Sequence, residues 1–190
     1  MSLNCFGKKD LMPLVTRKYV KDYKLSEYRD ADGKIKTESV YVGSYFYFTN
    51  PALAHKTVKA FAVAAGVALI SFIAAMIPNS GAMHSFYITL PFIFCALPLA
   101  YIIRAVWAGF TEKEPFVRSV SERFSNWLRY APVFGAAISG YSLIAEGITA
   151  VASPKKMMSG DLVFSAGCAL YLAAMLFIFY RSFAVKTEKR

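Results

Sequence analysis

The residue with the clearest chemical potential is Glu146, a carboxylate inside an apolar segment. It lies in the stretch YSLIAEGITAVA, residues 141–152, within a run of more than twenty residues that otherwise carries no charge. Ionisable groups inside membrane spans are costly to keep there and commonly bind protons or ions. The polar residues on the same segment that can share such a role are Ser139, Tyr141, Ser142 and Thr149.

The depth of Glu146 decides how costly its charge is. If this segment enters the membrane from the cytoplasm near Trp127, Glu146 lies 19 residues further along, about 28 Å up the helix at ~1.5 Å per residue. That is close to the outer end, where a carboxylate reaches water more easily. Three readings stay open: Glu146 meets water or Lys155 or Lys156 of the next loop, it faces the bundle and titrates or binds a cation, or it contacts a partner subunit.

The residue inventory does not favour an enzyme. His55 and His84 fall on opposite sides of the predicted membrane, and Cys5, Cys95 and Cys168 have no paired or metal-binding spacing. The sequence also lacks a phosphate-binding glycine loop, a nucleophile elbow and a pair of intramembrane aspartates. We therefore predict no catalytic residue, no metal site and no cofactor.

Four apolar runs set the predicted fold. With 56% hydrophobic and 16% aromatic residues, the chain is far more apolar than soluble domains, and each run has the roughly 20 residues that a membrane-crossing helix needs. The predicted class is an all-α polytopic membrane protein, a four-transmembrane-helix bundle with a small N-terminal cytoplasmic β-hairpin region. The predicted parts are a basic region 1–56, a transmembrane domain 57–185 with spans 57–77, 86–110, 127–152 and 162–185, and a cytoplasmic tail 186–190.

The distribution of Lys and Arg predicts the orientation. Eleven precede residue 60, five lie at 104–129 and four follow residue 180, whereas only Lys155 and Lys156 lie in the remaining connections. Under the positive-inside rule this places both termini in the cytoplasm. The same distribution assigns the net charge of +10 to membrane orientation and argues against nucleic-acid binding. Which membrane holds the protein is not specified.

Residues 18–48 are predicted to form the hairpin. Tyr, Val and Thr recur on both sides of Asp32-Gly33, a pair that suits a two-residue turn. That turn would set Leu25 opposite Val40 and Tyr23 opposite Val42 and so create one apolar face. A lone hairpin is marginal in water, and we expect support from a third strand, a partner or the headgroup layer. The basic residues on this surface, which can attract anionic lipid or an acidic partner, are Lys18, Lys21, Lys24, Arg29, Lys34 and Lys36.

Two further patterns concern the packing of the spans. Small residues recur every four positions in the first span (Ala60, Ala64, Ala68) and in the fourth (Ser165, Ala169, Ala173), which is typical of close helix packing. Residues 112–125 combine capping-box spacing with one apolar face, which predicts a short interfacial helix on the inner leaflet or a helical turn packed beneath the bundle. Pro91 and Pro98 are expected to kink the second span.

The function that these features favour is an integral membrane interaction or accessory subunit. It would pack against a larger membrane partner or against itself as an oligomer, in contact with lipid, without catalytic activity of its own. The alternative is a small oligomeric transporter or channel that uses Glu146.

Cysteine labelling tests the predicted orientation. In a chain in which Cys5, Cys95 and Cys168 are replaced, Lys155→Cys should react with an impermeant maleimide applied to intact cells, because the positive-inside rule leaves this loop outside. Lys189→Cys should react only after the membrane is permeabilised. Equal labelling of both positions in intact cells would contradict the orientation.

Overall fold

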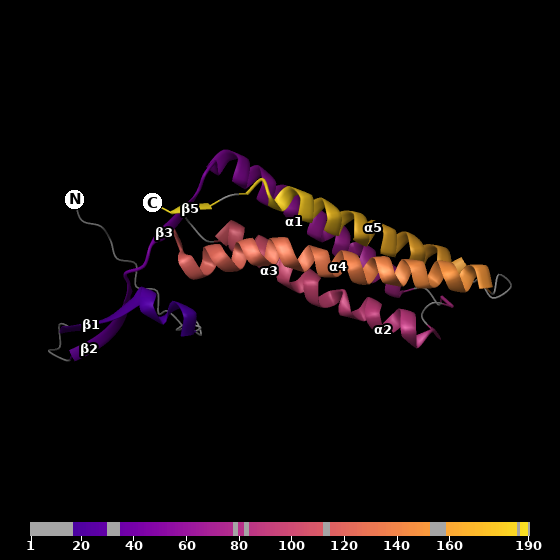
Figure 1. The fold of residues 1–190 in the computed structure, drawn as a ribbon, viewed down its shortest axis with the longest axis horizontal. Coiled ribbons are helices and arrows are strands. Elements are labelled where there is room, and N and C mark those ends of the chain that lie inside the picture. The colour runs from indigo at the N-terminus through magenta and orange to yellow at the C-terminus, as the bar shows by residue number, and fades with distance from the viewer. Residues whose placement is uncertain are drawn as a thin grey trace.

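Five helices dominate the structure. The computed structural model describes residues 17–29, 35–77, 80–81, 84–111, 115–152, 159–185 and 187–189. Its helices run side by side along the long axis of the molecule (Figure 1) and are α1 (Pro51–Met76), α2 (Phe86–Phe94), α3 (Ala96–Thr111), α4 (Arg118–Ala152) and α5 (Ser159–Ser182). We call the end that carries the strands the sheet end. The opposite end, where α1 leads to α2 and α4 leads to α5, is the loop end.

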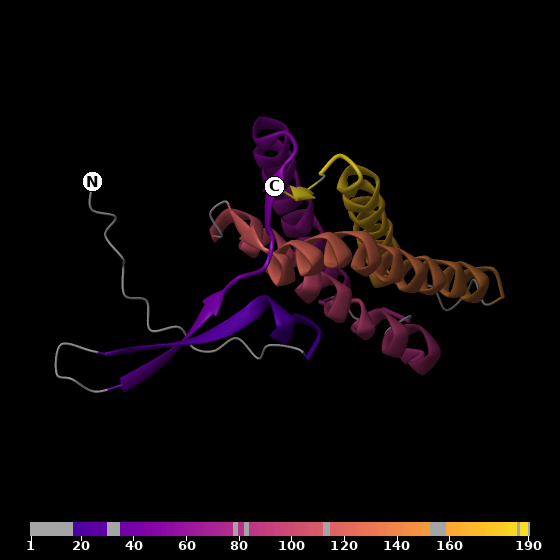
Figure 2. The same cartoon turned by 60° about the vertical axis from the view of Figure 1, so that its left-hand side comes forward.

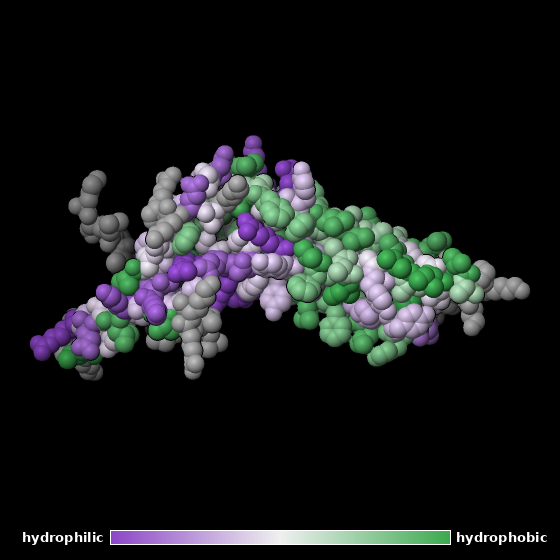
Figure 3. Space-filling model, viewed as in Figure 1, coloured by the Kyte–Doolittle hydropathy of each residue, from purple (hydrophilic) through white to green (hydrophobic). Residues whose placement is uncertain are grey.

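Among the described residues, four helical segments are long and apolar enough to cross a membrane. They are Pro51–Met76, Phe86–Thr111, Arg118–Ala152 and Gly160–Ser182. Each overlaps a predicted span, but the first and third begin earlier than predicted, at residues 51 and 118 rather than 57 and 127. Hydrophobic side chains cover the bundle, whereas hydrophilic ones gather at the sheet end (Figure 3). This arrangement is compatible with a multi-pass membrane protein.

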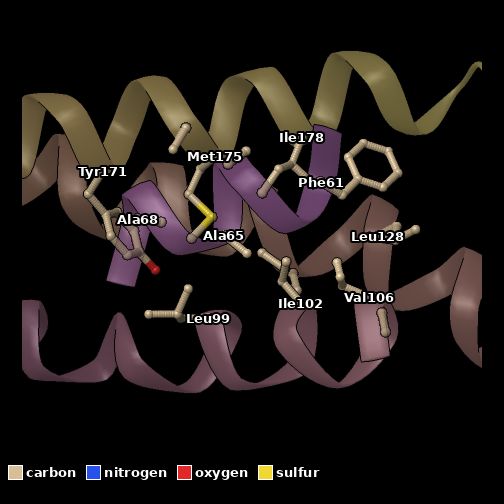
Figure 4. Packing of buried hydrophobic residues seen from close by; sticks show 14 of the residues in the cluster. Phe61, Ala65, Ala68, Leu99, Ile102, Val106, Leu128, Tyr171, Met175 and Ile178 are labelled. Carbon is tan, nitrogen blue, oxygen red and sulfur yellow. The ribbon is translucent and has the colours of Figure 1, made fainter. Parts of the chain in front are cut away.

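The bundle core is built from side chains of all five helices, including Phe92 of α2. Phe61, Ala68, Ile102, Leu128 and Met175 are buried in one continuous cluster, and they lie between α1, α3, α4 and α5 (Figure 4). α5 packs on both α1 and α4, and α3 packs on α4. In a membrane, where lipid is as apolar as these side chains, the association would depend on close packing.

The second span is divided into α2 and α3 at Cys95. Pro98 explains the position of this break, since proline has no amide hydrogen and its ring clashes with the carbonyl four residues earlier, at Phe94. The Cys95 carbonyl accepts a hydrogen bond from the buried Tyr171 hydroxyl of α5, at 2.7 Å. The predicted kink is therefore present, and α5 braces it.

A three-stranded sheet closes the sheet end. Strand β3 (Tyr45–Phe48) pairs with β4 (Phe116–Val117) on one edge and with β5 (Thr187–Lys189) on the other. The N-terminal region, the α3–α4 connection and the C-terminal tail are thereby joined. α1 begins directly after this sheet, where the Asn50 side chain accepts a hydrogen bond from the Leu53 amide and caps the helix.

The hairpin is present but shorter than predicted and in a different register. A 3₁₀ helix, η1 (Arg17–Asp22), precedes β1 (Tyr23–Arg29), which pairs with β2 (Ile35–Tyr41). Leu25 lies opposite Ser39, and Val40 lies opposite Lys24. The strands are joined by residues 30–34, which lie outside the described residues and include Asp32-Gly33. This connection shifts the register by one residue from that of a two-residue turn, so the predicted apolar face is divided between the two faces.

The prediction of a separate helix at 112–125 is wrong for residues 115–125, the part that the structure describes. α4 begins at Arg118 and continues unbroken to Ala152, so the amphipathic segment forms its first turns. Phe116 and Phe124 are buried against Phe48. The apolar face of this segment packs beneath the bundle, in agreement with the second of the two readings. The Thr111 hydroxyl donates to the Trp107 carbonyl and so belongs to the end of α3.

α1 and α5 approach each other closely at Gly167. A Cβ atom at Gly167 would lie 2.7 Å from the Cβ of Ala75 and 2.9 Å from the carbonyl oxygen of Ser71. The predicted alanine positions divide: Ala64 and Ala68 of α1 are buried and Ala60 is half-buried. In α5, Ser165 is half-buried, whereas Ala169 and Ala173 face outward. The interior seam of α5 therefore runs through Gly167.

Gly167→Ala should destabilise the protein by about 1–3 kcal/mol, because the added methyl group overlaps α1 backbone. Gly66→Ala is the matched control, since no atom lies within 4 Å of a Cβ there, and it should be neutral or stabilising by about 0.5–1 kcal/mol. Thermal unfolding in detergent compares the two variants. Equal stability of the two would show that α1 and α5 are not in close contact at Gly167.

Candidate functional site

Glu146 lies on a polar face of α4 that is turned into the bundle. Ser139, Ser142 and Glu146 are all buried, and Thr149 is half-buried further along the same face. These positions are three or four residues apart, the spacing that aligns side chains along a helix. Tyr141 does not share the face and is 50% exposed. The structure thus brings four of the five predicted polar residues together.

The hydroxyl groups on this face bond to their own helix. Ser139 donates to the Gly135 carbonyl at 2.8 Å, Ser142 to the Ile138 carbonyl at 3.1 Å and Thr149 to the Ala145 carbonyl at 2.9 Å. Thr149 also contacts the Tyr87 hydroxyl of α2 at 3.0 Å. None of these bonds goes to the carboxylate of Glu146.

Glu146 itself is buried without a hydrogen-bond partner. Its side chain is 5% exposed, so it faces the bundle and does not extend to water. Neither carboxylate oxygen has a hydrogen bond in the part of the chain that the structure describes. The predicted contacts with Lys155 and Lys156 lie outside the described residues. A buried carboxylate in this state is one of the most expensive groups a protein can hold.

Asp161, which the sequence analysis did not single out, is a second buried carboxylate beside Glu146. It lies in the first turn of α5, is 6% exposed and is an electrostatic neighbour of Glu146. The Ser165 hydroxyl also lies beside the Glu146 carboxylate but does not reach hydrogen-bond geometry. The predicted span began at residue 162 and so excluded Asp161. The available signal was the short connection after Glu146, because two antiparallel helices so joined bring residues 146 and 161 to the same end.

The described cysteines and histidines add no metal-binding group to this pair, and Cys5 lies outside the described residues. Cys95 and Cys168 are free and buried. His55 lies at the sheet end, and His84 precedes α2 at the loop end, with its Nδ1 atom 2.9 Å from the Ser80 carbonyl. Within the described ranges, no three His, Cys, Asp or Glu residues are grouped so that they could hold a metal ion.

The predicted basic surface is only partly described. Lys21, Lys24 and Arg29 are exposed; Lys34 lies outside the described residues, as do the side chains of Lys18 and Lys36. The segment 23–41 contains four basic residues, but it also contains four acidic ones, Glu27, Asp30, Asp32 and Glu38. The strands and their connection therefore carry no net charge, and the attraction of the basic surface to anionic lipid or an acidic partner stays a prediction.

No protein-family model, curated protein or solved structure matches the chain.

Tyr171→Phe should lower the stability of the bundle by about 1 kcal/mol, because it removes the donor to the buried Cys95 carbonyl. Tyr141→Phe makes the same chemical change at an exposed position of α4 and should have no effect. Unfolding in detergent measures both. If the two variants are equally stable, the bond to the kink does not support the fold.

Proposed function

We propose that this protein is a membrane-embedded interaction subunit that presents its β1–β2 hairpin to a partner and carries no catalytic activity of its own. The bundle would pack against a larger membrane protein or a second copy, with the hairpin in the cytoplasm. The observation that carries the proposal is the hairpin itself. It extends away from the bundle as a two-stranded sheet (Figure 2), and its apolar side chains Leu25 and Ile35 are exposed.

The base of the hairpin is attached to the bundle. The Tyr19 hydroxyl donates to the Glu122 carboxylate of α4 at 3.0 Å, and the Tyr41 hydroxyl accepts from the Arg118 amide at 3.1 Å. Burial raises the pKa of Tyr41 above its ordinary value, so this hydroxyl stays protonated and donates to the Ser44 carbonyl. A hairpin held at its base loses less freedom when a partner binds its outer half.

The outer half offers both edges and apolar side chains. Leu25 is 74% exposed and Ile35 is 64% exposed, and both lie on one face of the sheet. Among the described strands, neither β1 nor β2 pairs with a third. Unpaired edges accept an extended segment of another polypeptide, with main-chain hydrogen bonds for affinity and side-chain contacts for specificity. With no net charge on the hairpin, we expect the partner to be such a segment with apolar side chains.

The mass of the intact complex tests this proposal. After mild extraction at native expression level, the protein should carry a second component, another protein or another copy, at a fixed ratio. Leu25→Ser combined with Ile35→Ser should reduce the retained component at least tenfold, because both apolar contacts are removed. Thr37→Ser, on the same face of the hairpin, should keep it.

Two results would contradict the proposal. One is a wild-type protein that is a monomer without a stoichiometric component. The other is a double variant that retains the complex unchanged. Unfolding of the double variant should match that of the wild type, because both side chains are exposed.

A further inference from the structure

We propose that Glu146 and Asp161 form a binding site for one exchangeable cation at the loop end of the bundle. Two carboxylates from neighbouring helices are buried there, and one of them has neither oxygen hydrogen-bonded within the described residues. A second negative charge beside an unpartnered one adds repulsion to the cost of burial. A bound cation removes both penalties.

The two carboxylates differ in how the fold supports them. Asp161 lies in the first turn of α5, where the helix dipole favours negative charge. Glu146 lies six residues before the end of α4, outside the terminal turn in which the helix dipole acts, so no helix terminus stabilises its charge. Glu146 is therefore the carboxylate that most needs a positive counter-charge.

The donor atoms define the class of ligand. Glu146, Asp161 and the adjacent Ser165 hydroxyl offer only oxygen, the donor type of hard cations such as Na⁺ and Ca²⁺ and of the proton. Only two of the described ionisable groups contribute, fewer than a site closed by protein ligands needs. This donor set suits a weakly held hard cation that keeps water ligands, or a proton shared between the two carboxylates.

Of the described ionisable groups, Asp161 is the one that acts electrostatically on the Glu146 carboxylate. The ionisable residue that follows Asp161 on α5 is Cys168, a buried free thiol. On α2 the ionisable residue is Tyr87, which contacts Thr149. The stretch 60–77 of α1 contains no ionisable side chain. His84 precedes α2, and Lys155 and Lys156 belong to the undescribed connection after α4.

The site lies at the end of the bundle, close to both connections. A Cβ atom at Gly81 would lie 3.4 Å from both carboxylate oxygens of Asp161, so Gly81 lies against this carboxylate. Because the pair lies at this end of the bundle, we expect a cation to exchange with solvent from the loop end, without a pore through the bundle.

Thermal unfolding of the full chain in lipid nanodiscs tests the site. One series raises NaCl or CaCl₂ at fixed pH and ionic strength, balanced with choline chloride, and a second series lowers the pH without metal. Once the cation concentration exceeds the dissociation constant, each tenfold increase in that concentration should raise the melting temperature by about 3–6 °C. For the proton, a tenfold increase is a decrease of one pH unit.

Three substitutions make the result specific. Glu146→Gln and Asp161→Asn should each abolish the dependence, because they remove the charge and keep the shape. Glu27→Gln removes one acidic residue from the exposed hairpin and should leave the dependence unchanged. A response to Na⁺ or Ca²⁺ identifies a metal ion, and a response to acid alone identifies the proton.

Two outcomes would overturn the proposal. One is a wild-type melting temperature that does not depend on metal ions or on pH. The other is a dependence that persists in Glu146→Gln. Glu146 lies in the part of α4 that leads to α5, whereas the hairpin lies at the opposite end of the bundle (Figure 1), so Glu146→Gln should retain any partner that the hairpin binds. The two proposals can therefore fail separately.

Discussion

The structure depends on the close approach of its long helices. In an apolar solvent the hydrophobic effect does not drive helices together, so contact between backbones and small side chains must do so. Gly167 of α5 provides such a contact, against Ser71 and Ala75 of α1. α5 also packs along α4, and its Tyr171 braces the break between α2 and α3. Each of the other three spans is therefore positioned by its contact with α5.

The close packing of α4 and α5 also creates the main unfavourable electrostatic interaction in the bundle. The packed α4–α5 pair buries Glu146, and α5 brings a second buried carboxylate, Asp161, beside it. Close helix packing favours small or apolar side chains beside Glu146, whereas electrostatics favours a positive charge there. Polar groups that a fold holds against such a cost are good candidates for ligand binding, which is why this pair attracts a functional proposal.

The sheet end solves a different problem, that of holding three distant segments together outside the bundle. Phe46 pairs with Phe116 on one side and with Lys189 on the other. The aromatic contacts of Phe48 with Phe116 and Phe124 connect this sheet to the start of α4. The hairpin is attached to the resulting platform through Tyr19 and Tyr41 but adds no strand to it. A rigid support and an open sheet together suit a surface that binds another chain.

The sequence by itself determined the four apolar segments, the break in the second span and the existence of the hairpin. Each follows from local properties: segment length and hydropathy, the missing amide of Pro98 and the strand-forming residues on either side of a turn. The tertiary structure alone decided the hairpin register, the extension of α4 back to Arg118 and the strand pairing of the C-terminal tail. It also decided that Ala169 and Ala173 face outward while Gly167 faces α1, and that Asp161 lies beside Glu146. These features depend on contacts between residues far apart in the chain, and the spacing of residues within one helix or strand does not specify which neighbour it meets.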